Sequence, residues 1–341
     1  MARRWLKRFI KIVGFGLIAL LLLLSVAISL TIGWRPIIGA KARPLVERKF
    51  EPTPARMERG RYLVEGVAAC FTCHSELDWK SEGAPPLPAK KGAGLVWSLE
   101  GMPWLTAPNI TPDIETGAGK WSDDKMARAI REGIGHDGRA LFPLMPYTLY
   151  RRMSDEDLAA IVVYLRSVAP VRNALPQTQV PFPVSRLIQN APQPIESTVS
   201  PPDMADAVKR GEYLSTLAAC IDCHTPKEKG QPLAGMDFAG GFILSEPDKK
   251  VASANITPDS TGISYYTEAL FVEMMRTGHV KARRLSPVMP WIIYRNMTDE
   301  DLKAIFAYLR TLPGVRHQVD NTERPTPCKL CRQQHGLGDR N

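Results

Sequence analysis

The chain has 341 residues, of which 44% are hydrophobic and 23% charged, and its formal net charge at pH 7 is +9. The length suggests two or three domains, and six cysteines are too few for a disulfide scaffold. Five basic residues fall within the first eleven positions, which leaves +4 for the remaining chain and gives no reason to expect a nucleic-acid partner.

The first 34 residues contain an uncharged run that predicts a membrane anchor. The run extends from Ile12 to Trp34, whereas a transmembrane helix needs about 20 apolar residues and a cleavable signal about 7–15. The basic residues before it favour a cytoplasmic N-terminus in the inner membrane, with the rest of the chain in the periplasm. The alternative is a long signal peptide cut after Ala27 or Ala40. No convincing small-x-small site ends the run, so we expect an uncleaved, single-pass helix within residues 1–34.

Two proline-containing segments are expected to connect folded units. Residues 35–52 contain three X-Pro pairs and are predicted to form a tether off the membrane surface. Residues 172–202 contain seven prolines. A linker of that composition is semi-extended and stiffer than a Gly/Ser tether, so it would limit how far its two flanking domains can separate.

Two copies of the spacing Cys-x-x-Cys-His organise the rest of the chain. They are Cys70-Phe71-Thr72-Cys73-His74 and Cys220-Ile221-Asp222-Cys223-His224. This spacing attaches haem c, because both thiols reach vinyl groups on one porphyrin edge and the histidine supplies the proximal iron ligand. A disulfide, a redox dithiol or half a zinc site would not need that histidine. The sequence therefore predicts two covalently bound haem c groups.

The surroundings of the two motifs repeat as well. The matching segments are Arg59–Leu63 with Arg210–Leu214, Asn109–Asp113 with Asn255–Asp259, Pro143–Tyr147 with Pro287–Trp291, and Met153–Leu158 with Met297–Leu302. Their offset drifts from 151 to 144 residues, so the loops differ while the framework persists. We therefore place two copies of one domain at about 53–171 and 203–316, with a tail over 317–341.

Each copy is expected to contain three helical stretches and little strand. The first runs into the haem motif, and the third presents an apolar face that would pack against the first, where Gly60 or Gly211 permits close approach. The third helix begins with a pattern like a capping box, in which aspartate replaces the usual glutamate. The predicted N-caps are Thr53, Ser122, Thr267, Ser154 and Thr298.

The sixth iron ligand is expected from a methionine in each copy. Met145 and Met289 both lie in Pro-x-Met-Pro-aromatic, where the prolines hold an extended loop that presents one thioether. Most methionines only fill core space, but repetition inside a matched loop favours ligation. Met153 and Met297 also repeat, although they directly precede a helix cap and are expected to be packing residues.

Other residues near the motifs have weaker assignments. His136 and His279 precede the methionine loops, and we expect propionate contact or surface exposure rather than iron ligation for them. The repeated Asn-Ile-Thr-Pro-Asp segment is interpreted as a turn beside each haem, with propionate contact as a second role. Trp97, Trp104 and Trp121 occur only in the first copy, where they could cover its haem edge.

The tail carries a third cysteine pair, Cys328 and Cys331, followed by Arg332 instead of histidine. Without that histidine we predict no third haem, and no further copy of the domain surrounds the pair. A disulfide is the interpretation we favour. A metal site with His335 has only three evident ligands, and a redox dithiol lacks a βαβ context.

With these repeated segments in view, residues 53–316 resemble the cytochrome c subunits of membrane-bound alcohol, aldehyde, gluconate and fructose dehydrogenases. Those subunits usually carry three haems and a C-terminal membrane attachment, whereas this chain has two motifs and an N-terminal run. The resemblance implies electron transfer from a partner dehydrogenase to ubiquinone or the respiratory chain.

The fold expected is all-α, with an N-terminal transmembrane helix followed by two tandem class I-like cytochrome c domains. By the match of motifs, Cys70, Cys73, His74 and Met145 would hold one haem, and Cys220, Cys223, His224 and Met289 the other. The iron ligands would be His74, Met145, His224 and Met289, with no catalytic residue. A free-standing carrier between a quinol-oxidising complex and a terminal oxidase, and a dihaem enzyme such as a peroxidase, are the alternatives.

Overall fold

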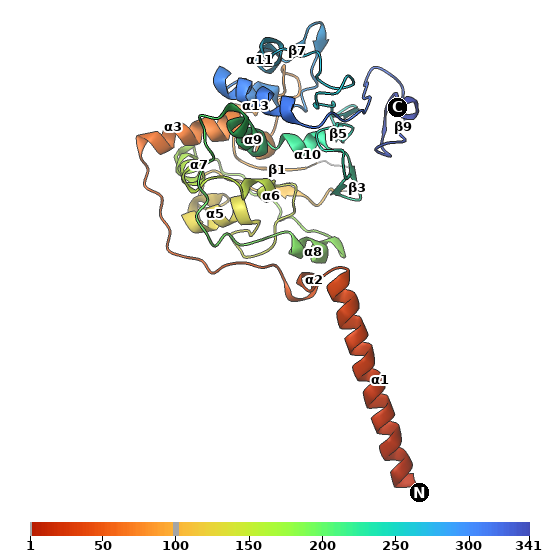
Figure 1. Cartoon of the computed structure of the whole chain (residues 1–341). Helices are drawn as coiled ribbons and strands as arrows, with labels where there is room; N and C mark the ends of the chain where they lie inside the picture. Colours follow the sequence, from red (N-terminus) through yellow and green to blue (C-terminus); the bar gives the residue numbers. More distant parts are fainter. Residues whose placement is uncertain (1, 98–101) are drawn as a thin grey trace.

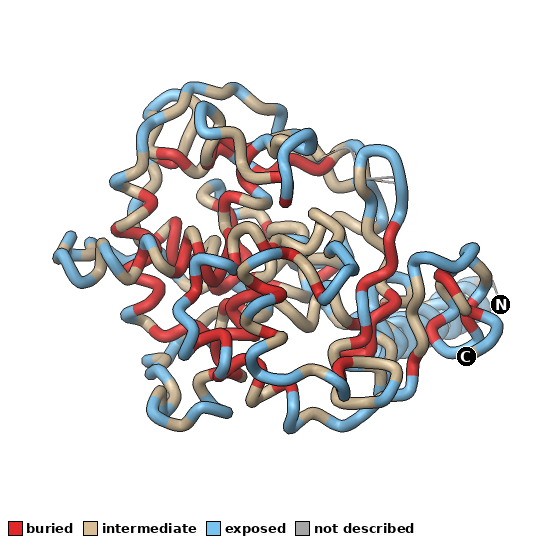
Figure 2. Tube along the Cα trace, turned by 90° about the horizontal axis from the view of Figure 1, so that it is seen from above, coloured by how far each residue is buried: buried red, intermediate tan, exposed pale blue. Residues whose placement is uncertain are grey.

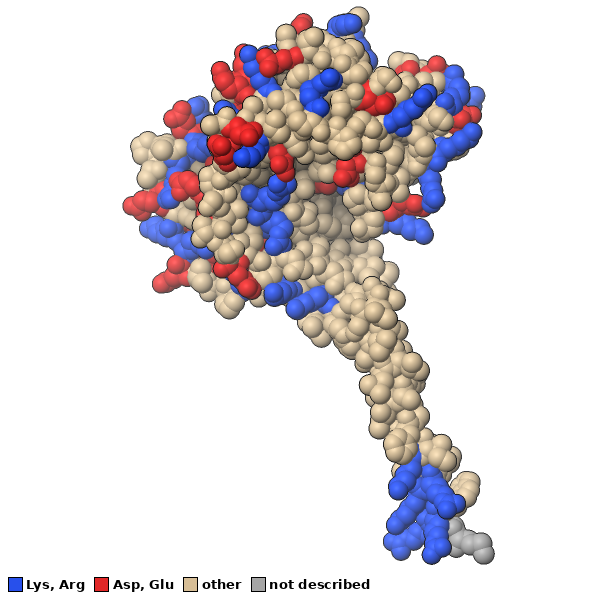
Figure 3. Space-filling model, in the orientation of Figure 1, with Lys and Arg blue, Asp and Glu red and all other residues tan. Residues whose placement is uncertain are grey.

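The computed structural model describes residues 2–97 and 102–341. A single long helix, α1 (Ala2–Leu30), stands away from a body that holds the rest of the chain (Figure 1). The stretch Arg3–Leu30 is long and apolar enough to cross a membrane, and none of it is buried against the body. Lys and Arg side chains cover the free end of the helix, and the shaft is without charge (Figure 3).

The helix is displaced from its expected position toward the N-terminus. It begins among the basic residues, which are themselves good helix formers, and it ends at Leu30 rather than Trp34. Gly33 adopts a left-handed φ of 69°, and its N–H donates to the carbonyl of Ile28. A glycine in this conformation terminates helices, which explains the earlier stop.

The first domain contains these elements in chain order: α3 (Pro54–Tyr62), the π-helical turn η1 (Leu63–Val67), α4 (Cys70–Cys73), η2 (Pro88–Lys90), β1 (Leu95–Val96), β2 (Thr106–Ala107), η3 (Ala118–Lys120), α5 (Asp123–Glu132), α6 (Tyr147–Tyr150) and α7 (Asp155–Ser167). The second domain contains α9 (Ala207–Leu217), α10 (Cys220–His224), β3 (Lys227–Glu228), β4 (Gln231–Pro232), β5 (Ile243–Ser245), β6 (Lys250–Ala252), α11 (Glu268–Thr277), β7 (His279–Val280), β8 (Arg283–Arg284), α12 (Trp291–Tyr294) and α13 (Asp299–Thr311). Outside the domains lie α2 (Arg35–Ile38), α8 (Val184–Leu187), η4 (Ile188–Asn190), β9 (Pro325–Pro327), β10 (Gln334–Gly336) and η5 (Gly338–Arg340).

The body is rich in helix, but the expectation of an all-α fold needs refinement. The described residues form five separate two-stranded antiparallel pairs, with strands of two or three residues. Such short pairs close loops and build no sheet core. They escaped sequence analysis because two or three residues are too few to show an alternating pattern.

In each domain the first helix packs closely on the last. A Cβ atom at Gly60 would overlap the carbonyl oxygen of Ala160 in α7, and one at Gly211 would overlap that of Ala304 in α13. The predicted role of both glycines is therefore confirmed. Buried residues of both domains form one connected core, which runs through the middle of the body (Figure 2).

All five predicted N-caps are confirmed. Each side-chain oxygen accepts the backbone N–H three residues further on, at the start of α3, α5, α11, α7 and α13, from Thr53, Ser122, Thr267, Ser154 and Thr298. This interaction satisfies one of the four unpaired N–H groups at a helix start. The residue types at these positions therefore determined where the helices begin.

The two domains meet through a reciprocal pair of hydrogen bonds. Tyr62 in α3 of the first domain donates its hydroxyl proton to Asp301 in α13 of the second. Conversely, Tyr213 in α9 donates to Asp157 in α7, at 2.8 Å. Both tyrosines occupy matching positions in the repeat, so the interface relates the two copies by an approximate two-fold axis.

This interface also explains why the predicted capping box is only half formed. The Ser154 hydroxyl accepts the N–H of Asp157 as expected, at 3.1 Å. The Asp157 carboxylate does not return to the helix start, because Arg59 and Tyr213 bind it. Instead, the Ser154 N–H donates to the hydroxyl of Tyr213, at 3.0 Å. The second domain repeats the arrangement with Tyr62 as the tyrosine from its neighbour.

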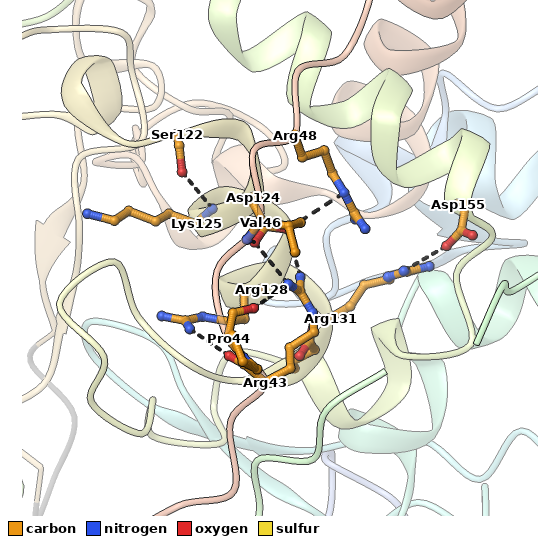
Figure 4. Close-up of polar contacts among 11 residues, drawn as sticks. Arg43, Pro44, Val46, Arg48, Ser122, Asp124, Lys125, Arg128, Arg131 and Asp155 are labelled. Carbon is orange, nitrogen blue, oxygen red and sulfur yellow. Dashed lines mark hydrogen bonds and ion pairs between the residues drawn. The ribbon is translucent and has the colours of Figure 1, made fainter. Parts of the chain in front are cut away.

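The segment between α2 and α3, expected as a free tether, runs along the first domain. Arg43 binds Asp124 with both terminal nitrogens, at 2.9 and 2.8 Å, and its Nε binds Glu132 at 2.9 Å (Figure 4). The N–H groups of Val46 and Phe50 donate to Asp124 and Asp123 in the first turn of α5. Carboxylates in the first turn of α5 thus bind the segment between α2 and α3, which has no regular secondary structure.

The proline-rich segment between the domains also contacts the base of α1. The Asn190 side chain donates to the carbonyl of Ile32, and the Gln189 side chain accepts the N–H of Ala40. The short helices α2 and α8 lie side by side at this point (Figure 1). The segment therefore connects the emerging helix to the body as well as joining the two domains.

Candidate functional site

Each Cys-x-x-Cys-His segment forms one turn of helix that starts at a strained residue. Ala69 and Ala219, the N-caps of α4 and α10, have left-handed φ values of 47° and 53°. This conformation is unfavourable for alanine, and its presence at both matching positions shows that the fold imposes it. It turns the chain sharply between the first helix of the domain and the cysteine pair.

In each segment the first cysteine packs against the edge of the core, and the second is exposed. Cys73 is exposed and Cys70 half-buried, yet surrounding protein raises the pKa of each thiol to about 12 by desolvation. Cys220 and Cys223 repeat the same exposures, and burial raises their pKa values to about 12 and about 11.

Both histidines are oriented by a backbone carbonyl. The Nδ1 atom of His74 lies 2.8 Å from the carbonyl oxygen of Pro108, and that of His224 lies 2.7 Å from the oxygen of Ala254. A carbonyl only accepts, so Nδ1 carries the proton and Nε2 keeps a free lone pair for a metal. Burial lowers the pKa of both imidazoles, which keeps them neutral, as iron ligation requires.

The repeated Asn-Ile-Thr-Pro-Asp turn fixes that carbonyl. Asn109 directly follows Pro108, and its side chain accepts from the N–H and hydroxyl of Thr111 and donates to the carbonyl of Val171. Asn255 makes the equivalent contacts in the second domain. The turn thus connects the carbonyl that binds the histidine with the segment that follows the last helix of the domain.

The methionine loops are linked to the cysteine segments through a tyrosine. Tyr150 at the end of α6 donates its hydroxyl proton to the carbonyl of Ala68, two residues before Cys70, at 3.0 Å. In the second domain, Tyr294 makes the same bond to Ala218, at 2.7 Å. These tyrosines, absent from our sequence assignments, could have been found because they recur at the same distance after the methionine.

Met145 and Met289 are half-buried, unlike the other repeated methionines. The aromatic residue that ends each loop, Tyr147 in the first domain, packs on Gly133 at the end of α5 so closely that a Cβ there would overlap its ring. Met153 is fully buried and Met297 is 3% exposed, as expected for packing residues. Of the four repeated methionines, the two in the loops are therefore the ones that remain partly exposed.

A pocket of about 470 Å³ adjoins the Pro108 carbonyl in the first domain. Trp121 and His136 line it and stack on each other, with ring centroids 4.3 Å apart and planes 9° from parallel. Arg139 adds a positive charge to the lining. Trp121 was expected near a haem edge, and His136 was expected to contact a propionate or the solvent. The pocket brings the two rings together beside Pro108, whose carbonyl supports the histidine.

The two domains also contact each other beside the cysteine segments. The side chain of Asn296, which follows α12, donates to the carbonyl of Glu65 in η1, at 3.0 Å, and η1 leads into the first cysteine segment. Conversely, α6 of the first domain contacts α9, which leads into the second cysteine segment. The reciprocal interface therefore joins the elements that carry the two candidate haem sites.

Two thiols on one helical turn, followed directly by a histidine with a free Nε2, suit covalently attached haem in each domain. Residues 57–169 and 208–313 each match the family model described as "Cytochrome c". The chain belongs to the cytochrome c family. Its two matched regions carry two covalently bound haem c groups.

Several curated proteins are similar to this cytochrome over most of its length. The cytochrome c subunit of the quinone-dependent alcohol dehydrogenase of Gluconobacter oxydans is 27% identical, over 76% of this chain and 55% of the relative. The fructose dehydrogenase cytochrome subunit of Gluconobacter japonicus is 30% identical, over 77% and 55%. A dihaem c-type cytochrome of Cereibacter sphaeroides is 26% identical, over 73% and 83%. The chain thus spans about half the length of the two dehydrogenase subunits.

The third cysteine pair differs from the favoured expectation. Cys328 and Cys331 are separate, buried thiols and form no disulfide in the structure. His335, the residue considered as a third ligand, lies with them, and so does His317, which sequence reasoning did not connect to the pair. The ten residues between His317 and Cys328 hid that relation.

Proposed function

We propose that this cytochrome is anchored to the inner membrane by α1 and relays electrons on the periplasmic side. The observation that carries the proposal is the matched pair of histidine and thiol sites, one in each of two domains that a reciprocal interface joins. An exposed helix of 28 apolar-rich residues with a basic end supports anchoring by an uncleaved helix.

Bound haem supplies one-electron chemistry at its iron. The chain's own residues would hold that iron: His74 and Met145 would be its ligands in the first domain, and His224 and Met289 in the second. Cys70, Cys73, Cys220 and Cys223 would attach the two porphyrins. A ligand pair of histidine and methionine would raise the reduction potential and leave no open position, which suits electron transfer and opposes substrate binding.

The partner proposed is a periplasmic dehydrogenase, of which this chain would be the electron-transfer subunit. The relatives that are subunits of alcohol, fructose and gluconate dehydrogenases support this role. Electrons would pass from the dehydrogenase through both haems toward a quinone or the respiratory chain. The direct contact between the two domains supports transfer between the two haems within the chain.

A free-standing carrier is the second candidate. The dihaem relative from Cereibacter sphaeroides favours it, because this chain covers 83% of that protein against 55% of the alcohol dehydrogenase subunit. Such a carrier would connect a quinol-oxidising complex with a terminal oxidase without a permanent partner. The two candidates share every feature of the haem sites and differ only in what binds the protein.

Mild detergent extraction followed by affinity purification separates the two candidates. A dehydrogenase in stoichiometric amount, whose substrate reduces both haems, would establish the subunit role. A cytochrome that purifies alone but exchanges electrons with an oxidase or a soluble cytochrome would establish the carrier. Rapid peroxide turnover by the purified protein would contradict both, because it requires an open iron position.

A further inference from the structure

Four side chains with metal-binding atoms converge where the second domain meets the tail. His317 follows α13, Cys328 and Cys331 lie in the turn between β9 and β10, and His335 lies in β10. Their ligand atoms all lie within 4.8 Å of one another, and the four residues are between 0 and 4% exposed. We propose that this cluster is a structural zinc site, independent of the haems.

Two separations between ligand atoms of the cluster are close to the edges of a tetrahedron around a single ion. The Nε2 atoms of His317 and His335 are 3.1 Å apart, and Cys328 Sγ lies 3.4 Å from His317 Nε2. With Zn–N near 2.0–2.1 Å and Zn–S near 2.3 Å, the edges of a tetrahedron are about 3.3 Å between nitrogens and about 3.5 Å between nitrogen and sulfur. Two cysteines and two histidines are also the donor set that selects zinc.

The outer nitrogens of both rings fix the tautomer that ligation needs. His317 Nδ1 lies 2.9 Å from the carbonyl oxygen of Ala239, and His335 Nδ1 lies 2.9 Å from that of Gly336. Each Nδ1 must therefore carry the proton, so two Nε2 lone pairs face each other. A proton shared between them would bury a positive charge. Zinc with two thiolates and two neutral imidazoles is a neutral unit, which costs far less to bury.

The cluster also gives the tail a buried centre, which its other side chains do not provide. Among residues 318–341 the buried ones are Cys328, Cys331, His335 and two glycines, so no aliphatic or aromatic side chain forms a core there. A segment this short needs a disulfide or a metal to hold one fold. N–H groups of Leu330 and Asn341 point at Cys328 Sγ, at 3.4 and 3.1 Å, as expected around a thiolate.

The site would connect the tail to the second haem. His317 binds the carbonyl of Ala239, and the next residue, Gly240, donates its N–H to the carbonyl of His224 at 2.7 Å. Gly241 passes so close to His317 that a Cβ atom would lie 2.6 Å from its ring. Zinc at this position would brace the loop on which the proximal histidine rests.

Metal analysis of the full-length holoprotein tests the proposal, with the haem iron as an internal standard. The protein is extracted in detergent and purified without a metal-chelate column. We expect one zinc for every two irons. Because the haem cysteines are thioethers, alkylation after denaturation with a chelator should label two thiols. Absence of metal together with a Cys328–Cys331 disulfide would overturn the proposal, and stoichiometric copper or extra iron would overturn the assignment to zinc.

Variants locate the ion. Cys328→Ser combined with Cys331→Ser should lower zinc at least tenfold while both haems remain, which shows that the domains still fold. His279→Gln, a histidine outside the cluster, is the matched control and should keep the full zinc content. Trypsin should cleave after Lys329 or Arg332 in the double variant, or in wild type treated with 1,10-phenanthroline, but not in untreated wild type. Unchanged zinc in the double variant would contradict this location.

Discussion

At the scale of residues, Met145 and Met153 show how position separates two methionines of one domain. Met153 is completely buried in the core, whereas Met145 stays half-buried in a loop whose end is anchored near the cysteine segment through Tyr150. A packing methionine gains from complete burial, but a ligand must leave its sulfur free to face iron. The same contrast separates Met289 from Met297.

Removal of one loop methionine should open one iron. In Met145→Leu, or separately Met289→Leu, we expect the reduced protein to bind one equivalent of carbon monoxide and the potential of that haem to fall, because a thioether ligand is lost. Visible absorption during carbon monoxide titration measures both the amount and the site. Met153→Leu is the control and should bind none. If both loop variants remain closed to carbon monoxide, another residue is the ligand.

Asp124 should give the attachment of the segment before α3 a defined pH dependence. Its pKa is lowered because the bonds from Arg43 and the N–H of Val46, with Arg48 nearby, outweigh desolvation. A lowered pKa contributes stability that is present above the unfolded value near 3.8 and is lost as pH falls through the folded value. Glu132, which also faces Arg43, has a raised pKa from burial and acts with the opposite sign.

Comparison of Asp124→Asn with wild type isolates that contribution, since Glu132 is present in both. At pH 7 the variant should be less stable by about 2 kcal/mol, the value of a hydrogen-bonded charge that loses its partner. Thermal unfolding between pH 7 and pH 3 should show this difference constant above about pH 5 and shrinking toward acid pH, where the wild-type carboxylate is protonated too. A difference that does not change with pH would show that the charge is not responsible.

At the scale of elements, the close packing of α3 on α7 depends on a glycine. Ala normally stabilises a helix by about 1 kcal/mol relative to Gly, but at position 60 its methyl would overlap the carbonyl of Ala160. Gly60→Ala should therefore destabilise the protein by about 1–3 kcal/mol, the cost of overpacking. Gly66→Ala is the matched control, because its Cβ would meet only ordinary contacts at 3.7 Å. Urea unfolding measures both, and an unharmed Gly60→Ala would show that the helices can separate.

The elements that the sequence predicted are those with local causes. Helix caps and the cysteine turns depend on residue types within a few positions, and the sequence contains them directly. The contacts of Gly60 and Gly211 join distant helices, but both glycines recur at matching positions of the repeat, which made them predictable. The strand pairs, the course of the segment around Arg43, and the partner of Ser154 depend on contacts between distant residues. His317 was missed for the same reason, because only the folded tail brings it to Cys328.

At the scale of the whole molecule, the two domains share one core and are joined by the reciprocal tyrosine–aspartate hydrogen bonds. Burial, with Asp301 nearby, raises the pKa of Tyr62 to about 12, so the hydroxyl keeps its proton at every physiological pH. The pKa of Tyr213, which makes the matching bond to Asp157, is raised as well. A fixed relation between the domains is what a chain of two haems requires, because transfer between them depends on their separation.

Loss of both interface hydroxyls should loosen this relation. In the double variant Tyr62→Phe and Tyr213→Phe, the aspartate and the helix-start N–H group that each tyrosine binds both lose a partner. We expect the free energy of unfolding to fall by about 1 kcal/mol or somewhat more for each tyrosine. Urea unfolding of the full chain in detergent, followed by haem absorption, measures the loss. Tyr265→Phe is the control, because Tyr265 is 53% exposed, and it should leave stability unchanged. If the double variant matches wild type, other contacts hold the domains together.

The central claim is that both haems carry electrons and that neither iron has an open ligand position. A redox titration of the full chain in detergent, with carbon monoxide added to the reduced state, tests this claim most directly. We expect two one-electron steps, low-spin spectra in both oxidation states, and no carbon monoxide binding at either haem. A haem that becomes high-spin or binds carbon monoxide readily in the unmodified protein would contradict the claim. It would show an open iron position and favour a dihaem enzyme instead.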